Sequence, residues 1–243
     1  MNFKLDTHCH TIASGHAYCT ILEMVSHAKK LGLQMISFTE HGPAMPAGAN
    51  VLYFDNLKVL PNIIDGVEVL KGAEVNIMDF DGGLDIPQET LMKLDFVIAS
   101  FHDIIRPPAS IKEHTEAIIN LMKKPYIHMI GHPGNPTFPI DIEAVVSAAK
   151  ATGTILEINN SSLKPNSFRA GSKENCFKIL EECYKRGVPV ALGSDAHITF
   201  DIANFTHGIE MIKALEVPEE LILNTSVDRF KSTINAKNIL KCK

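Results

Sequence analysis

The chain has 243 residues, of which 45% are hydrophobic and 21% are charged, and its formal net charge is −5 at pH 7. This composition is typical of a globular protein, and it excludes a disordered, collagenous or coiled-coil chain. The chain lacks the blocks of lysine and arginine that bind duplex phosphates, so nucleic acid is not an expected partner.

Short apolar runs typical of strands alternate with stretches of helical periodicity along the chain. The predicted strands are residues 3–7, 35–39, 70–76, 96–100, 127–131, 155–159 and 189–193. The predicted helices are residues 21–31, 111–123, 141–151 and 173–186, and Gly32, Gly153 and Gly187 follow three of them at positions typical of C-caps. About seven βα units predict an α/β fold, a parallel sheet closed into a TIM-like barrel, in a single domain over residues 1–243. A doubly wound open sheet is the alternative.

Three further features concern the setting of this fold. The longest irregular stretch, residues 42–56, is interpreted as an active-site loop. No apolar run reaches the roughly 18 residues of a membrane span, so we expect a cytoplasmic protein that binds no membrane. The five cysteines form no CxxC pair, which favours free thiols in a reducing compartment over a disulfide framework.

Histidine is abundant, with 11 residues, and many of them follow predicted strands. In a parallel barrel the functional groups gather at the C-terminal ends of the strands and in the loops that follow. The side chains at these ends are His8, His10, His16, His41, Glu74, His102, His132, Asp195 and His197. Imidazole and carboxylate together favour Zn²⁺, Mn²⁺ or Fe²⁺ over Mg²⁺ or Ca²⁺. Nine such groups exceed what one tetrahedral ion accepts, so they predict two or three ions, with zinc as the leading choice.

Short motifs that together span almost the whole chain carry a family resemblance. They are His8-Cys9-His10 with His16, Glu40-His41-Gly42-Pro43, Gly72-Ala73-Glu74, Phe101-His102, Gly131-His132-Pro133-Gly134-Asn135-Pro136, Glu157-Ile158-Asn159-Asn160-Ser161-Ser162 and Gly193-Ser194-Asp195-Ala196-His197. These motifs resemble those of the PHP superfamily, named for polymerase and histidinol phosphatase, and they are most similar to its YcdX-type phosphatases. The resemblance implies a distorted (βα)7 barrel in which all nine ligand positions of the family are filled.

The resemblance also implies a cofactor of three Zn²⁺ ions per chain, with Mn²⁺ or Fe²⁺ as alternatives. The implied ligand sets are His8, His10, Glu74 and Asp195 for one ion, His16, His41 and His197 for a second, and Glu74, His102 and His132 for a third. Glu74, Asp195 and His197 are the expected catalytic residues of a phosphatase that hydrolyses small phosphomonoesters through a metal-activated hydroxide. Some relatives of this branch form trimers, so a homo-oligomer is one expectation.

Other residues have predicted supporting roles. Asn159, at the end of the sixth predicted strand, and Arg169, in the loop that follows, are candidates to bind the substrate. A guanidinium is well shaped for a phosphate. Alternatively, Arg169 is a solvated cation of the loop, and the Asn159 amide only satisfies hydrogen bonds of the backbone. Asp6 shares a strand face with the first ligands and is expected to orient a ligand imidazole. Cys9 is expected to point away from the ligands, and His114, on a helical pattern, is expected at the surface.

The motifs leave other activities open. Within the family, a histidinol-phosphate phosphatase and a 3′-5′ exonuclease are the alternatives, and the missing basic surface disfavours the nuclease. An amidohydrolase also has an HxH first strand, but it expects a bridging lysine on the fourth strand, and residues 96–102 contain none. A non-catalytic zinc-binding module is disfavoured because structural zinc sites are usually closed and mononuclear.

Overall fold

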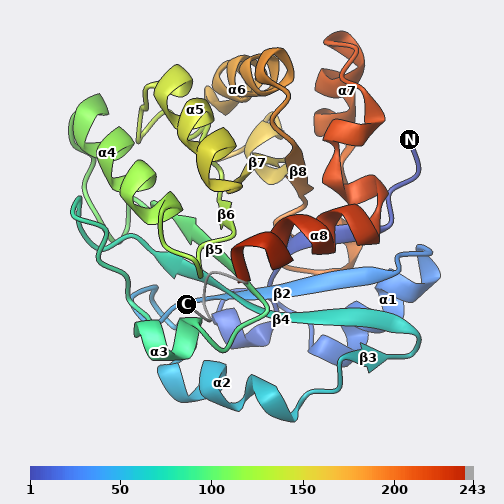
Figure 1. Cartoon of the computed structure of the whole chain (residues 1–243). Helices are drawn as coiled ribbons and strands as arrows, with labels where there is room; N and C mark the ends of the chain where they lie inside the picture. Colours follow the sequence, from blue (N-terminus) through green and yellow to red (C-terminus); the bar gives the residue numbers. More distant parts are fainter. Residues whose placement is uncertain (239–243) are drawn as a thin grey trace.

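The computed structural model describes residues 1–238, and its central feature is a sheet of parallel strands that curls into a nearly closed barrel (Figure 1). In spatial order the strands are β1 (Leu5–Cys9), β2 (Met35–His41), β4 (Val67–Asn76), β5 (Phe96–Ser100), β6 (Met129–Ile130), β7 (Ile155–Asn159) and β8 (Val190–Gly193). The short β3 (Ile63–Ile64) pairs with β4 in the antiparallel direction. Past the last strand, the N–H of Asp195 donates to the carbonyl of His8 at 2.9 Å and so brings the two ends of the sheet together.

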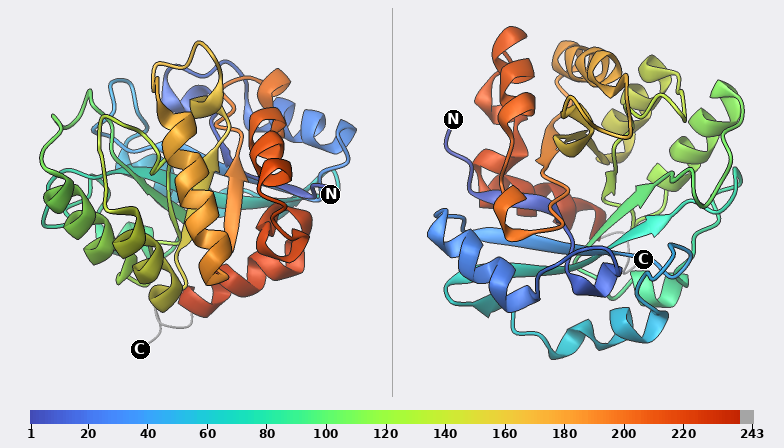
Figure 2. Two further views of the ribbon diagram at one scale, coloured as in Figure 1. Left: turned by 90° about the horizontal axis from the view of Figure 1, so that it is seen from above. Right: turned by 180° about the vertical axis from the view of Figure 1, so that it is seen from behind.

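Helices cover the outside of this sheet (Figure 2). They are α1 (Ile21–Lys30), α2 (Val51–Asn56), α3 (Gln88–Leu91), α4 (Ile111–Met122), α5 (Ile142–Thr152), α6 (Ser172–Arg186), α7 (Thr206–Ala214) and α8 (Val227–Asn238). Capping boxes begin α1 at Thr20 and α4 at Ser110, where each cap hydroxyl is matched by a glutamate at the third helical position. Gly153 and Gly187 end α5 and α6 in the left-handed conformation that glycine adopts without a Cβ penalty.

Helix α8 closes the N-terminal end of the barrel. Its Phe230 and Ile234 are buried among apolar side chains from the strands, including Phe96 of β5. The Nζ of the buried Lys237 donates to the carbonyl of Met122 at 2.8 Å and thereby ties α8 to the end of α4. Because packed side chains fill this end, functional groups collect at the opposite, C-terminal ends of the strands.

The structure confirms the barrel and overturns the open-sheet alternative. Strands 96–100 and 155–159 match their predicted bounds, whereas the regular part of β6 is only Met129–Ile130. Two further hydrogen bonds to β5 flank this short strand. The N–H of His128 donates to the carbonyl of Val97, and the N–H of Gly131 donates to the carbonyl of Ala99. Helices α2, α3, α7 and α8 were not predicted, and α2 occupies the end of the stretch 42–56. Within residues 1–238, no helix is both long and apolar enough to cross a membrane.

Candidate metal centre

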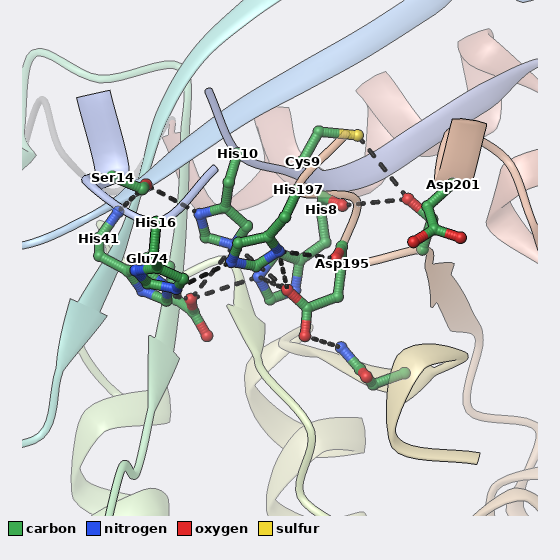
Figure 3. A network of polar contacts seen from close by, with 12 residues as sticks. His8, Cys9, His10, Ser14, His16, His41, Glu74, Asp195, His197 and Asp201 are labelled. Atoms are coloured by element: carbon green, nitrogen blue, oxygen red, sulfur yellow. Dashed lines mark hydrogen bonds and ion pairs between the residues drawn. The ribbon is translucent and has the colours of Figure 1, made fainter. Parts of the chain in front are cut away.

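Glu74 lies at the centre of a cluster of histidines at the C-terminal end of the barrel (Figure 3). Its carboxylate is buried at 1% exposure. The ring nitrogens that approach it are His41 Nδ1 at 2.8 Å, His132 Nε2 at 3.0 Å, His8 Nε2 at 3.3 Å, His102 Nε2 at 3.4 Å and His10 Nε2 at 3.5 Å. These residues come from the ends of β1, β2, β5 and β6, so the parallel sheet delivers five imidazoles to one carboxylate.

Asp195 is the second acidic group of the cluster. Its Oδ1 lies 3.3 Å from Nε2 of His10 and 3.6 Å from Nδ1 of His197. The Nε2 atoms of His197 and His16 face one another at 3.0 Å. The structure therefore brings all nine predicted ligands together, with His16 and His197 on the solvent side.

Backbone geometry explains how neighbouring residues take different directions. His8 and His10 are two apart on one strand and point into the cluster, whereas Cys9 points to the other side and packs with α1, as predicted (Figure 3). His132 and Asp195 sit just past their strands with φ of 31° and 55°. Such left-handed conformations are strained for residues with a side chain, and they persist where surrounding contacts hold a functional group in place.

The donor set fits a bound cation. The Nε2 atoms of His8, His10 and His102, Nδ1 of His41 and Oε2 of Glu74 are buried and lack a hydrogen-bond partner. Buried polar atoms of this kind need a partner, because removal from water without one is costly. Among the described residues, three sets of ligand atoms lie within 4.8 Å of one another: His8 with His10 and Glu74, His10 with His41 and His197, and His41 with Glu74 and His102. Metal ions bound within the cluster would satisfy these atoms.

Buried carboxylates behind the histidines fix which ring nitrogen carries the proton. Oε1 of Glu157, on β7, lies 2.7 Å from Nδ1 of His8, and a carboxylate can only accept, so Nδ1 carries a proton and Nε2 is the ring atom that faces the cluster. The Ser14 hydroxyl donates to Glu40 at 2.6 Å, which leaves its oxygen to accept from Nδ1 of His10 at 3.1 Å.

His102 is oriented by a similar chain of contacts. The amide nitrogen of Asn76 donates to Asp85, which turns the amide oxygen toward Nδ1 of His102 at 2.8 Å. Asp85 also accepts from the backbone N–H of Asn76 at 2.9 Å and from that of Ala44 at 3.1 Å. The Nε2 lone pair of His102 therefore faces Glu74, as expected for a metal ligand held by an outer carboxylate.

Burial and mutual charge set the protonation states of the cluster. Burial lowers the pKa of His102 to about 4 and also lowers the pKa of His132, so both rings are neutral. Burial by itself would raise the pKa of Glu74, but the charge of His8 holds it well below its usual range. Burial would likewise lower the pKa of His8, but Glu157, Glu74 and Asp195 raise it well above normal. Two ionised carboxylates, Glu74 and Asp195, therefore face the cluster, and such groups attract cations.

Arg169 and Asn159, the predicted substrate contacts, both reach Asp195. One guanidinium nitrogen of the buried Arg169 lies 3.2 Å from Oδ2 of Asp195 and 3.1 Å from the Ser162 hydroxyl. The Asn159 amide donates to the same Oδ2 at 3.3 Å, and its oxygen accepts from the Ser162 hydroxyl at 2.8 Å. Asn159 is therefore engaged in holding Asp195, and Arg169 lies at the edge of the cluster.

Two expectations about supporting residues were wrong. Asp6 does not orient an imidazole, because its carboxylate accepts from the backbone N–H groups of Ser194 at 3.2 Å and Ala203 at 2.8 Å. His114 is buried, not at the surface. Its Nε2 accepts from the N–H of Ala109 and its Nδ1 donates to the carbonyl of Pro139, so it joins the loops that follow His102 and His132.

Comparisons with known proteins agree with this geometry. A family model described as PHP domain matches residues 6–237. A protein of Thermoanaerobacter sp. named a probable phosphatase is 53% identical over 238 residues, which cover 98% of this chain and 96% of that protein. A probable phosphatase of Acetivibrio thermocellus is 49% identical over 237 residues, covering 98% of this chain and 97% of that one.

Solved structures share the fold at low sequence identity. The histidinol phosphate phosphatase of Lactococcus lactis, crystallised with zinc, L-histidinol and phosphate, has a TM-score of 0.61 at 18% identity and covers 88% of this chain and 94% of its own. The putative histidinol phosphatase of Listeria monocytogenes has a TM-score of 0.59 at 18% identity, over 82% of this chain and 97% of its own. The fold of this chain is thus shared with other proteins.

Proposed function

Because this chain belongs to the PHP domain family, we propose that it is a metal-dependent phosphatase that hydrolyses small phosphomonoesters at a cluster of three zinc ions. The observation that carries the proposal is the convergence of five imidazoles within 3.5 Å of the Glu74 carboxylate, four of which present a buried ring nitrogen that lacks a hydrogen-bond partner. The names of the curated relatives and the zinc and phosphate bound by the Lactococcus lactis enzyme support it.

The nine converging side chains are enough to hold three ions. In the proposed assignment, Glu74 would be shared between two ions, one also held by His8, His10 and Asp195 and the other by His102 and His132. The solvent-side residues His16, His41 and His197 would hold the third. Mn²⁺ or Fe²⁺ would suit the same mixture of nitrogen and oxygen donors.

Divalent ions at this site would generate a nucleophile from water at neutral pH and neutralise the charge of the phosphate oxygens. Within the chain, Glu74 and Asp195 supply the negative charge that retains the ions, and both stay ionised because neighbouring histidines lower their pKa values. Arg169, at the edge of the cluster, would donate to a phosphate oxygen, and Asn159 would keep Asp195 in position through its bond to that carboxylate. His197, beside Asp195 and on the solvent side, is the remaining proposed catalytic residue.

Metal content and ester hydrolysis test this proposal together. Protein purified without added metal should contain about three equivalents by elemental analysis, as catalytic clusters of this ligand number require. It should hydrolyse p-nitrophenyl phosphate in preference to bis-p-nitrophenyl phosphate, and chelation should abolish the activity. His132→Ala should lose both metal and turnover. His207→Ala should lose neither, because the ring of His207 contacts the exposed Glu210 and is not one of the proposed ligands.

Other results would redirect the proposal. Preference for the diester would favour a nuclease, and one equivalent of metal or none without hydrolysis of either ester would contradict a metal-dependent phosphatase. Histidinol phosphate belongs in the same assay, because two solved structures with this fold are a histidinol phosphate phosphatase and a putative one. The family model spans residues 6–237, which supports one catalytic domain. The oligomeric state and a cytoplasmic location stay predictions from the sequence.

A further inference from the structure

Two exposed aromatic side chains stand beside the cluster. Phe168, in the loop after β7, is 79% exposed, and the Arg169 guanidinium carbon lies 4.5 Å from the centre of its ring. Arg169 is itself fixed to Asp195 at 3.2 Å, so the exposed ring is one side chain away from a proposed metal ligand. Tyr18, in the loop after β1, is 77% exposed, and its N–H donates to the carbonyl of His197 at 2.9 Å.

The ring of Phe168 packs on the Arg169 guanidinium although it faces solvent. The guanidinium beneath it is anchored by Asp195 and by the Ser162 hydroxyl at 3.1 Å, and it is buried at 6% exposure. A cation packed against an aromatic face attracts it and restricts its orientation. A surface that is already ordered loses little conformational entropy when a ligand covers it, so this ring is suited to binding.

The loops around the cluster provide few cations that could bind a second anionic group of a substrate. The loops after β5 and β7 contain three cationic side chains, and the structure gives each of them a partner. Arg169 pairs with Asp195 and is the residue proposed to meet the phosphate itself, the Lys164 ammonium lies 3.1 Å from Asp201, and Arg106 donates to the carbonyl of Met78 at 3.3 Å. The loops of residues 10–20, 42–50, 77–87, 131–141 and 194–205 contain no lysine or arginine.

We propose that the enzyme selects phosphomonoesters whose alcohol is an uncharged planar ring, and that Phe168 is the residue that recognises this ring. The inference rests on the proposed phosphatase function. With the phosphate on the cluster and against Arg169, the ester oxygen and its substituent extend toward solvent, where Phe168 presents the adjoining apolar face. A flat ring stacked there removes apolar surface of both partners from water and gains the aromatic contact.

The test compares esters with flat and with flexible alcohols. kcat/KM is measured for phenyl phosphate, 1-naphthyl phosphate and glycerol 3-phosphate with wild type and Phe168→Ala. For each ester, kcat/KM of the variant is divided by kcat/KM of the wild type, so that differences in leaving-group chemistry between the esters cancel. Competitive inhibition by phenylphosphonate and methylphosphonate gives a binding measurement that needs no turnover. Phe200→Ala is the matched control, because Phe200 is also 79% exposed but its ring packs edge-on against His27 of α1 at 6.3 Å.

Phe168→Ala should lower kcat/KM for the aryl esters about five-fold more than for glycerol 3-phosphate, because one aromatic contact contributes about that factor. Inhibition by phenylphosphonate should weaken more than inhibition by methylphosphonate, by a similar factor. Phe168→Trp should retain the aryl preference, and Phe200→Ala should leave it unchanged. Metal content equal to wild type establishes that the cluster is intact. An equal effect of Phe168→Ala on aryl and alkyl esters would overturn the inference while phosphatase activity stands. Failure of the wild type to hydrolyse any ester would overturn both.

Discussion

Glu157 holds His8 through a 2.7 Å contact between its Oε1 and the ring Nδ1, although neither residue is exposed to solvent. The other oxygen of Glu157 accepts from the backbone N–H of His132 at 2.6 Å. One carboxylate on β7 therefore positions two proposed ligands, one by its ring and the other by its backbone. Gly193 on β8 leaves room for this arrangement, because a Cβ there would lie 1.8 Å from Glu157 Oε1.

Glu157→Gln should weaken metal binding about ten-fold, within the range observed for outer-shell partners of metal ligands. The glutamine oxygen can still accept from one partner, but its NH₂ group cannot accept from the other, so either His8 or the N–H of His132 loses its bond. Competition with a chromophoric chelator measures the affinity of the purified protein for Zn²⁺.

Glu116→Gln is the control for this substitution, because Glu116 lies on the exposed face of α4 and pairs with Lys112 at 3.8 Å. An affinity for Zn²⁺ that is unchanged in Glu157→Gln would show that Glu157 does not position the ligands.

The nine proposed ligands could be predicted because each follows the end of a strand, and in a parallel barrel these ends meet. Glu157 was not assigned a role, although a signal for it was present. It lies in a strand whose neighbours Leu156 and Ile158 are apolar, and a carboxylate in such a strand needs a buried partner. Ser14 and Asn76 gave no comparable signal, because their roles depend on which residues of other strands they face.

The burial of His114 illustrates what the sequence could not show. Its helix α4 has an ordinary amphipathic pattern, but the rings around His114 are Phe80, Phe101 and Phe138, which come from three loops. Loop positions are set by tertiary contacts and not by local periodicity. The same reason explains why the stretch 42–56 is predicted as irregular throughout although Asn50 caps a short helix within it.

Ser14→Ala should also weaken metal binding, by about ten-fold or more, because one hydroxyl serves three neighbours. It donates to Glu40 at 2.6 Å, and it accepts from His10 at 3.1 Å and from the N–H of His41 at 3.0 Å. Without it the Nδ1 proton of His10 is no longer fixed, so Nε2 is less available to a metal. Nitrogen chemical shifts of the imidazoles in metal-free protein should show a second tautomer for His10. Retention of a single tautomer in Ser14→Ala would contradict the role of the hydroxyl, and Ser26→Ala on α1 is the control.

Arg169→Met should reduce kcat/KM for phosphomonoesters about 100-fold while the metal content stays near that of wild type. A guanidinium that donates to a phosphate oxygen forms a charge-assisted hydrogen bond, and methionine keeps the bulk of the side chain without the charge. Inhibition by inorganic phosphate should weaken in parallel, which a steady-state assay measures. Arg186→Met is the control, since Arg186 pairs with Glu143 on the outer helices. Loss of metal from Arg169→Met would instead indicate that Arg169 acts through Asp195.

Lys237 should make the free energy of unfolding depend on pH in the alkaline range. Its ammonium is buried, and burial lowers its pKa from 10.5 to about 8. Between these two values the unfolded chain binds the proton that the folded chain has released, so the stability of the folded protein rises with pH. Relative to Lys237→Met, wild type should gain about 2 kcal/mol between pH 7.5 and 9.5, as a shift of this size requires. Urea unfolding of both proteins at the two pH values measures this difference, and the titration of every other group cancels in the comparison. Parallel pH profiles for the two proteins would show that Lys237 keeps its ordinary pKa in the folded state.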